Sequence, residues 1–483
     1  MNKTSIKKNY LYNLSYQILA IILPLITTPY LSRVLGAENI GIYSYSLSIT
    51  TYFILFGSLG VAMYGQREIA YIQDSIKKRS KVFFEIILIR SITLGISLLL
   101  FYFTFCLNGQ YSVYYKILIL EIIAHAIDIS WYFQGLEEFK KTVIRNTIIK
   151  LISVLCIFTL VKTSNDLNRY FIIYVLSTFF GNLSLWIYLP KYIKKTNIKD
   201  LNIIRHIRPI LMLFIPQIAT QIYTVLDKTM IGAIIADKAE VGYYEQAQKI
   251  IKLLLTIATS LGTVMMPRIA STFASGNKQK VREYMNNSFT FIIMLVLPLM
   301  FGIISISNNF VPLFYGAGYG KVTPLLCILS PIVVLIGLSN VTGTQFLLPT
   351  KQQNKYTLSV IIGAIVNFTL NLILIKKFAS IGASIATVIA ELSVTITQFI
   401  LIRKEVQALE VFKKSYKYMI AAIIMFICSN FIDCLISSNL LSIFLQTSIS
   451  IIIYFGVLFL LKDKMILEGL IILKEKFRKK DLN

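Results

Sequence analysis

Long apolar runs alternate with short polar ones from one end of the chain to the other. Each run approaches the roughly 20 residues that an α-helix needs to cross the hydrocarbon core of a bilayer. No polar stretch is long enough to fold as a soluble domain, so we expect an all-α polytopic membrane protein. The pattern predicts fourteen membrane-spanning helices, near residues 10–31, 41–64, 82–106, 114–135, 143–161, 170–190, 209–235, 241–266, 286–307, 322–347, 356–375, 380–402, 418–435 and 441–461.

Composition agrees with this class. The chain is 56% hydrophobic and 15% charged, with a mean hydropathy of +0.70, whereas globular domains carry about 25% charged residues. The net charge of +25 follows the predicted topology: 35 of the 48 Lys and Arg residues fall in loops on the N-terminal side, counting Arg145 at a span edge, and 8 in the opposite loops, counting Lys116 at a span edge. This bias places both termini in the cytoplasm and favours contact with anionic membrane lipids. Nucleic acid is not an expected partner.

Ionisable residues inside the predicted spans are the candidate functional groups. A charge at mid-bilayer costs about 3 kcal/mol even on a lenient insertion scale, so these groups should face one another or water. The candidate substrate-binding cations are Arg33 at an outer mouth, Arg90, Lys150, Lys228, Lys249 and Lys252. The acids inside the predicted spans are Glu85, Glu121, Asp128, Asp227, Glu245 and Glu391, and His125 is the one histidine. Glu85 is the one member of this set that we do not count as a site residue.

The fourth span carries an ordered polar face. Glu121, His125, Asp128 and Tyr132 follow at i, i+4, i+7 and i+11, which places them on one side of a continuous helix. Arg90 lies at a similar depth in the preceding span, so we expect an ion pair between Arg90 and Asp128. His125 is either a hydrogen-bonded packing residue or part of the cavity. We assign Tyr132 and its neighbour Trp131 to the inner aromatic belt.

The seventh and eighth spans repeat this pattern. Gln217, Gln221 and Lys228 fall on one face of the seventh, with Asp227 beside them. The eighth carries Glu245, Lys249 and Lys252 at i, i+4 and i+7. One polar face can hold two helices together, but several faces on different helices predict a shared cavity.

An internal echo predicts a duplication. The turn after the first span reads AENIGIY (37–43), and the turn after the seventh reads AEVGYY (239–244). Six spans separate the two, so the copies would share one orientation and be related by an axis along the membrane normal. We therefore predict a MATE-like arrangement of two six-helix bundles and two further helices. Its parts are residues 1–206 for the first bundle, 207–403 for the second, and 404–483 for the last helices and a basic cytoplasmic tail.

The residues favour a transporter over an enzyme. The sequence holds two His in all, no HExxH motif and no complete phosphate loop, because YGAGYGKVT (315–323) lacks the required Gly and Ser or Thr. We expect no cofactor and no metal. A proton or sodium gradient is the candidate driving force. The proton or sodium ion would be loaded on Glu121, Asp128 or Glu391.

Several segments resemble the Wzx-type polysaccharide biosynthesis flippases, which belong to the MOP transporter superfamily. The most specific segments are LPLITTPYLSRVLGAENIGIYSYSLSI (23–49), FGSLGVAMYGQREIA (56–70) and ISWYFQGLEEFK (129–140). LDKTMIG (226–232) and VGYYEQAQKI (241–250) look like the same family. The resemblance implies alternating access across a central cationic cavity in a bacterial cytoplasmic membrane.

The resemblance also implies a substrate, undecaprenyl-diphosphate-linked oligosaccharide, for synthesis of O-antigen, capsule or exopolysaccharide. A polysaccharide polymerase complex is a candidate partner. Three alternatives stay open at this point: a MATE-type drug or cation antiporter, a peptidoglycan lipid-precursor flippase and a noncatalytic scaffold.

Overall fold

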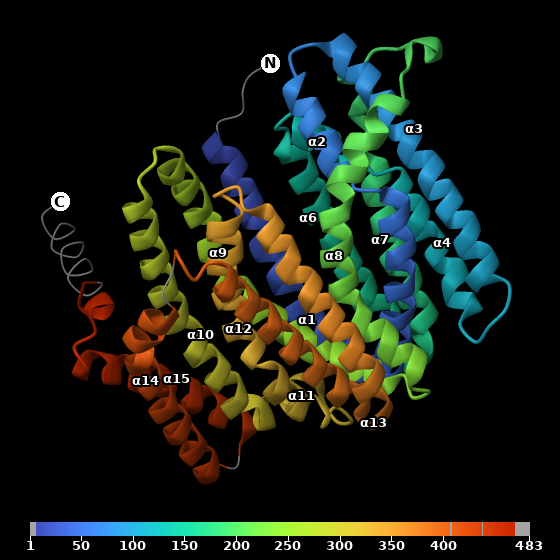
Figure 1. Cartoon of the computed structure of the whole chain (residues 1–483). Helices are drawn as coiled ribbons and strands as arrows, with labels where there is room; N and C mark the ends of the chain where they lie inside the picture. The colour runs from blue at the N-terminus through green and yellow to red at the C-terminus, as the bar shows by residue number, and fades with distance from the viewer. Residues whose placement is uncertain (1–5, 406–407, 437, 469–483) are drawn as a thin grey trace, which may run out of the picture. The chain divides into compact units, whose positions relative to one another are not determined.

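A computed structural model describes residues 6–405, 408–436 and 438–468, without the side chains of 6–17, 215–217, 219–220, 222–224 and a few other positions. Every regular element in these ranges is helical (Figure 1). The contacts divide the chain into two compact units, Met1–Gly242 and Tyr243–Asn483. This division differs from the one predicted from the sequence echo, which stays a prediction.

The N-terminal unit is built around one long, kinked helix. It comprises α1 (Ile6–Ser58), α2 (Val61–Tyr71), α3 (Ile76–Phe101), α4 (Ser112–Ala126), α5 (Ser130–Gly135), α6 (Phe139–Leu160), α7 (Leu167–Ser184) and α8 (Ile204–Ile234). α1 packs against α3, α4, α6 and α8, and α4 packs against α7. The predicted division puts α8 in the second bundle, whereas its contacts with α1 and α2 put it in this unit.

The C-terminal unit contains the remaining helices. These are α9 (Ala239–Ala274), α10 (Lys278–Tyr315), α11 (Val322–Leu329), α12 (Pro331–Ser339), the π-helical η6 (Asn340–Leu347), α13 (Gln353–Leu401), α14 (Ala408–Leu435) and α15 (Asn439–Leu460). The helices α14 and α15 pack against each other and against α10, and α13 packs against α11 and α12. The last two helices are therefore an integral part of this unit.

Ten helices in the described ranges are long and apolar enough to cross a membrane. Two of them hold two predicted spans each, because α1 is kinked at Gly36 (φ 78°) and α13 at Ala379 (φ 50°). Glycine adopts positive φ at little cost, which explains the sharp turn between the first two spans. The chain is thus a multi-pass membrane protein, and the count of fourteen spans stays a prediction.

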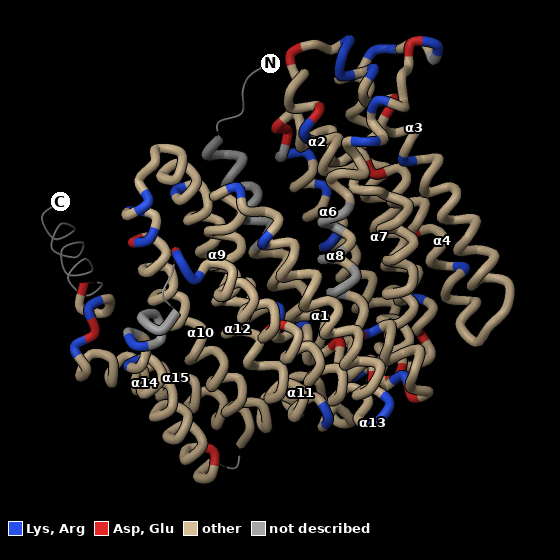
Figure 2. The backbone as a smooth tube through the Cα atoms, viewed as in Figure 1, with Lys and Arg blue, Asp and Glu red and all other residues tan. Residues whose placement is uncertain are grey.

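Large apolar side chains cover the outer faces of the helices, as they do in lipid. On α3, Ile96, Leu99 and Leu100 are each more than half exposed, and on α14 the same holds for Ile427 and Phe431. Charged residues of the N-terminal unit gather mainly near helix ends, for example around α2 and the start of α3 (Figure 2). The few charged groups deep within the helices are therefore the exceptions that need partners.

Two glycines bring α1 and the start of α9 into backbone contact. A methyl group added at Gly41 would overlap the carbonyl oxygen of Lys238, and one added at Gly242 would overlap that of Ala37. Lys238 lies four residues before Gly242, and Ala37 four residues before Gly41, so the two contacts are reciprocal. Both stretches lie within the N-terminal unit, which ends at Gly242. These are the two stretches that the sequence echo links.

Candidate functional site

The polar centre of the N-terminal unit lies at a break in a helix. α4 ends at Ala126 and α5 begins at Ser130, so residues 127–129 are not helical. The predicted ion pair is present here: Arg90 Nη2 lies 3.6 Å from Asp128 Oδ2, and the Arg90 side chain is only 3% exposed. Arg90 Nε also donates to the carbonyl oxygen of His125 at 2.8 Å. The guanidinium therefore binds both the carboxylate and the end of α4.

Side chains of α7 and the turn after it satisfy the other carbonyl groups at the break. Asn182 Nδ2 donates to the carbonyl of Ala124 at 2.8 Å, and Trp186 Nε1 donates to that of Ile127 at 2.7 Å. At the other side, Asp128 Oδ1 accepts from the backbone N–H of Ser130 at 2.9 Å. Broken helices persist inside membranes only where such partners replace the missing helical bonds. The break is thus a built feature of this unit.

Two predictions for this segment are wrong. Glu121, His125, Asp128 and Tyr132 do not share one continuous helix face, because the helix stops after Ala126. Its end is stabilised by side chains from other helices, which periodicity within one segment does not reveal. Trp131 and Tyr132 are fully buried in a cluster with Phe83, so they are core residues and not part of an aromatic belt.

A second polar group lies one turn before the break. Glu121 is 3% exposed, and its Oε1 lies 3.7 Å from Nε2 of His125, whose side chain is 34% exposed. Tyr43 of α1 and Tyr174 of α7 are both close enough to interact electrostatically with the Glu121 carboxylate. Glu121 Oε2 has no hydrogen-bond partner among the described residues. Glu121 is therefore a buried carboxylate whose ion-pair partner is His125.

The sequence did not single out a third cluster, the Glu85 network, made by Tyr64, Glu85, Asn202, Arg205 and His206. Glu85 is fully buried and accepts from the backbone N–H of Asn202 at 2.6 Å, from His206 Nε2 at 2.8 Å, and from Arg205. Tyr64 Oη lies 2.6 Å from His206 Nδ1. The network joins α2 and α3 to the start of α8. Spacing offers no signal for it, because Glu85 is 121 residues from His206.

The other candidates of the N-terminal unit differ widely in exposure. Arg33 and Gln221 are exposed, Lys228 is half-buried, and Asp227 is 2% exposed. The side chain of Gln217 lies outside the described residues. Lys150, also half-buried, lines a pocket between α6 and α7.

In the C-terminal unit, α9 carries a short ion pair. Lys249 Nζ lies 3.6 Å from Glu245 Oε1, at the predicted i, i+4 spacing, while Lys252 is exposed. Glu391 on α13 is 7% exposed and lies close to Tyr356. This unit therefore contains both a Lys–Glu ion pair and a buried carboxylate.

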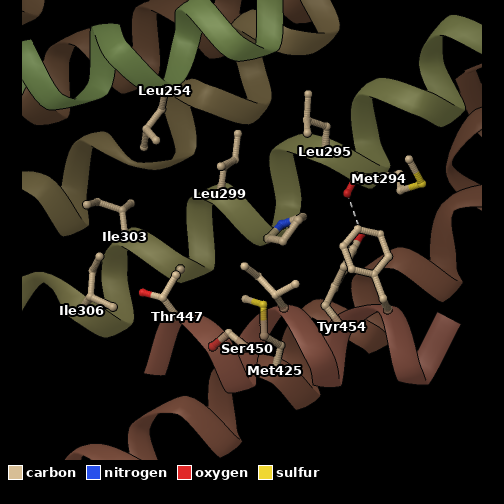
Figure 3. A pocket seen from close by; sticks show the side chains of 14 residues that line it. Leu254, Met294, Leu295, Leu299, Ile303, Ile306, Met425, Thr447, Ser450 and Tyr454 are labelled. Atoms are coloured by element: carbon tan, nitrogen blue, oxygen red, sulfur yellow. Dashed lines mark hydrogen bonds between the residues drawn. The ribbon is translucent and has the colours of Figure 1, made fainter. Parts of the chain in front are cut away.

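An apolar cavity of about 380 Å³ opens in the C-terminal unit between α9, α10, α14 and α15 (Figure 3). Leu254, Leu299, Ile303 and Met425 are among its lining residues. The hydroxyl group of Tyr454 is turned to the backbone, where it donates to the carbonyl of Met294 at 2.7 Å (Figure 3). The cavity therefore suits a hydrocarbon chain and not a polar ligand.

Each unit thus contains buried charged groups, but their roles in transport stay predictions. Arg90, His125 and Asp128 come together at the break, with Glu121 bound to His125. Glu245 and Lys249 form a separate pair on α9. A single water-filled chamber shared by all the predicted residues also stays a prediction.

Comparison with known families places these features in context. The family model "Polysaccharide biosynthesis protein" matches residues 6–273, and the model "Lipid II flippase MurJ" matches residues 149–459. Together they cover nearly all of the described helices. Each spans more than half of the chain.

Individual proteins agree with these models. A protein of Escherichia coli (strain K12), named "Putative O-antigen transporter", is 26% identical over 407 residues, which are 83% of this chain and 98% of the relative. The solved structure of the lipid II flippase MurJ in an inward closed conformation matches with a TM-score of 0.74 at 18% identity, over 94% of this chain and all of that one. An inward-facing MATE-family multidrug transporter of the MOP superfamily matches with a TM-score of 0.62 at 13% identity, over 80% of this chain and 95% of that one. The structural matches show the fold, and the family matches show that the chain belongs to the polysaccharide biosynthesis protein family, as a Wzx-type member of the MOP superfamily.

Proposed function

We propose that this protein moves undecaprenyl-diphosphate-linked oligosaccharide from the inner to the outer leaflet of a bacterial cytoplasmic membrane. The observation that carries the proposal is the family match over residues 6–273, supported by a relative named as an O-antigen transporter that aligns over 98% of its length. The product would serve synthesis of O-antigen, capsule or exopolysaccharide. This role is that of a transporter, not an enzyme.

The buried cations suit the head of such a substrate. A diphosphate and many sugar hydroxyl groups cannot cross hydrocarbon unaided, so they need charged and polar partners along the way. Arg90 Nη1 is buried without a hydrogen-bond partner among the described residues, so the guanidinium retains a donor for a ligand oxygen. Lys228 and Lys249, both half-buried, would add mobile positive charges.

The apolar cavity suits the tail. A polyprenyl chain needs a hydrocarbon-like surface, and the cavity between α10 and α15 is lined by Leu, Ile and Met side chains. The tail would lie there or in the surrounding lipid while the head crosses. Separate polar and apolar sites are what an amphiphile requires.

Buried acids would couple the movement to an ion gradient. Glu121 and Glu391 are 3% and 7% exposed, and Asp128 is paired with Arg90. Burying a charged carboxylate is costly, so loading it with a proton or a sodium ion would favour closure around the substrate. Alternating access driven in this way is the mechanism that we propose. Both termini would face the cytoplasm, as the excess of Lys and Arg in the N-terminal-side loops indicates.

A peptidoglycan lipid-precursor flippase is the second candidate. The match of the MurJ family model over residues 149–459 favours it. Its substrate would carry the same lipid diphosphate with a different head. A MATE-type drug or cation antiporter shares the fold but would need a net acidic binding site, whereas here the buried charges are mixed.

Depletion of the protein in its native bacterium tests the proposal. If it is correct, lipid-linked oligosaccharide accumulates and surface polysaccharide falls while peptidoglycan synthesis continues. Accumulation of peptidoglycan precursor with cell lysis would instead identify the second candidate. Sensitivity to cationic dyes without either lipid accumulating would identify a drug antiporter and overturn the proposal.

A further inference from the structure

A polar pocket of about 320 Å³ is lined by α6 and α7 in the N-terminal unit. This size is at the lower end of the roughly 300 to 1,000 Å³ of small-ligand sites. Facing residues follow helical spacing on both sides, with Asn146, Lys150 and Ser153 from α6, and Ser177 and Gly181 from α7. The small side chains on α7 leave the space open. The pocket is therefore produced by the sequence of both helices and not by loose packing.

The charge of the pocket is positive. Arg145 and Lys150 both line it, and its described lining residues include no Asp or Glu. The remaining polar lining residues are mostly hydroxyl and amide groups, which can donate hydrogen bonds to an anion. An anionic or strongly polar ligand fits such a lining, and an organic cation does not.

Arg145 is held in a fixed position at the pocket wall. Its Nη1 donates to the carbonyl of Gly181 and to Oδ1 of Asn182, both at 3.2 Å, and its Nε donates to Oδ1 of Asn146 at 2.8 Å. These three partners are neutral, and they orient the guanidinium. A preorganised guanidinium matches the paired oxygens of a phosphate group.

The pocket is also connected to the break in α4. Asn182 accepts from Arg145 through Oδ1 and donates through Nδ2 to the carbonyl of Ala124, at the end of α4. A ligand that displaces Arg145 would therefore also affect Asn182, whose side chain caps the end of α4. Arg90 and Asp128 lie at the same break.

Arg145 and Lys150 lie at successive positions along α6. Arg145 lies six residues after the first residue of α6, about 9 Å along the axis, and Lys150 lies about 16 Å along it. A lipid headgroup that enters from this end would meet Arg145 first and Lys150 next. The two cations would then hold a phosphate at two successive depths.

We propose that the pocket between α6 and α7 binds a lipid-borne phosphate group through Arg145 and Lys150. Two lipids carry this chemistry, an anionic phospholipid and the undecaprenyl diphosphate of the proposed substrate. The second source rests on the proposed function, whereas the first does not. The site is distinct from the apolar cavity, which lies entirely in the other unit.

Lipid binding to the purified full-length protein tests this site. Titration followed by native mass spectrometry measures the affinity for undecaprenyl diphosphate and for dioleoylphosphatidylglycerol, with dioleoylphosphatidylcholine as the zwitterionic comparison. The double variant Arg145→Gln/Lys150→Gln removes the charges. Ser177→Leu fills the pocket and keeps both cations, so it decides the question if the double variant does not fold. Lys162→Gln, an exposed cation in the turn after α6, is the matched control.

We expect both pocket variants to bind at least one anionic lipid about tenfold more weakly, because charge-assisted hydrogen bonds are lost or blocked. Lys162→Gln should bind like the wild type. Loss confined to undecaprenyl diphosphate identifies a substrate site, and loss confined to phosphatidylglycerol identifies a phospholipid site. Unchanged affinity of both folded pocket variants for both lipids overturns the inference. If the wild type binds phosphatidylglycerol but not undecaprenyl diphosphate, the proposed function fails while the pocket stands.

Discussion

Arg90 of α3 and Asp128 form an ion pair at the break between α4 and α5, with Arg90 Nη2 3.6 Å from Asp128 Oδ2. The same guanidinium caps α4 by donating from Nε to the carbonyl of His125 at 2.8 Å. One side chain therefore satisfies both a buried charge and a helix end. This dual role explains why the pair lies at the break and not within a regular helix.

A double-mutant cycle on polysaccharide export tests this pair. Arg90→Gln and Asp128→Asn should each lower export, and the double variant should be little worse than the stronger single variant. The expected coupling energy is about 0.5 to 3 kcal/mol, as for residues in one polar network. The pair Arg67 and Glu68, 3.3 Å apart with side chains 42% and 27% exposed, is the control and should show about 1 kcal/mol or less. Additive effects of Arg90→Gln and Asp128→Asn would mean that the pair does not act as a unit.

The backbone contact between Gly41 and Gly242 predicts a packing defect. Gly41→Ala places a methyl group on the carbonyl oxygen of Lys238, a backbone atom that cannot move away alone. Overpacking of this kind destabilises by about 1 to 3 kcal/mol, so the melting temperature of the purified protein should fall. Gly95→Ala is the control, because nothing lies within 4 Å of the added methyl group. Equal melting temperatures for the two variants would show that the contact is not tight.

The Glu85 network should fix the start of α8. Glu85→Gln removes the charge that Arg205 and His206 bind. Loss of one partner of a buried ion pair destabilises the folded protein by about 3 kcal/mol or more. The 45% exposure of the Arg205 side chain reduces this cost. We therefore expect a lower melting temperature and faster proteolysis between residues 193 and 203. Asp74→Asn, at an exposed carboxylate in the turn after α2, should leave both measurements unchanged. If Glu85→Gln resists proteolysis between residues 193 and 203 as well as the wild type does, Glu85 does not fix the start of α8.

Neutralising the candidate coupling acids should impair transport without impairing insertion of the protein into the membrane. Glu391→Gln and Asp128→Asn should reach the membrane in normal amounts but export polysaccharide several-fold more slowly, because the group that would load an ion is gone. The exposed Glu283, on α10, provides the control as Glu283→Gln. Wild-type export by both Glu391→Gln and Asp128→Asn would exclude these acids from coupling.

Patterning within single segments predicted much of the fold but little of the site. The apolar runs predicted the helices, and matched depths predicted the pair of Arg90 and Asp128, because depth follows directly from counting residues along a span. The echo between residues 37–43 and 239–244 identified two stretches that contact each other in the structure. Each of these features depends on spacing along the chain.

The missed features depend on partners from distant parts of the chain. The break at residues 127–129 exists because Asn182 and Trp186 satisfy the carbonyl groups that the helix gives up. Arg145 lies at the edge of the predicted span 143–161, where a cation is usually a topology signal, so its place in a pocket was not apparent. No periodicity in one segment encodes such contacts.

The most direct test of the account is translocation by the purified protein in vesicles. Proteoliposomes carrying undecaprenyl-diphosphate-linked oligosaccharide are exposed to an external glycosidase, and the cleaved fraction is followed over time. The account predicts that the protein makes the inner-leaflet pool accessible and that Arg90→Gln slows this markedly. A cleaved fraction no greater than in protein-free vesicles, with the protein folded and an ion gradient of either kind imposed, would contradict it.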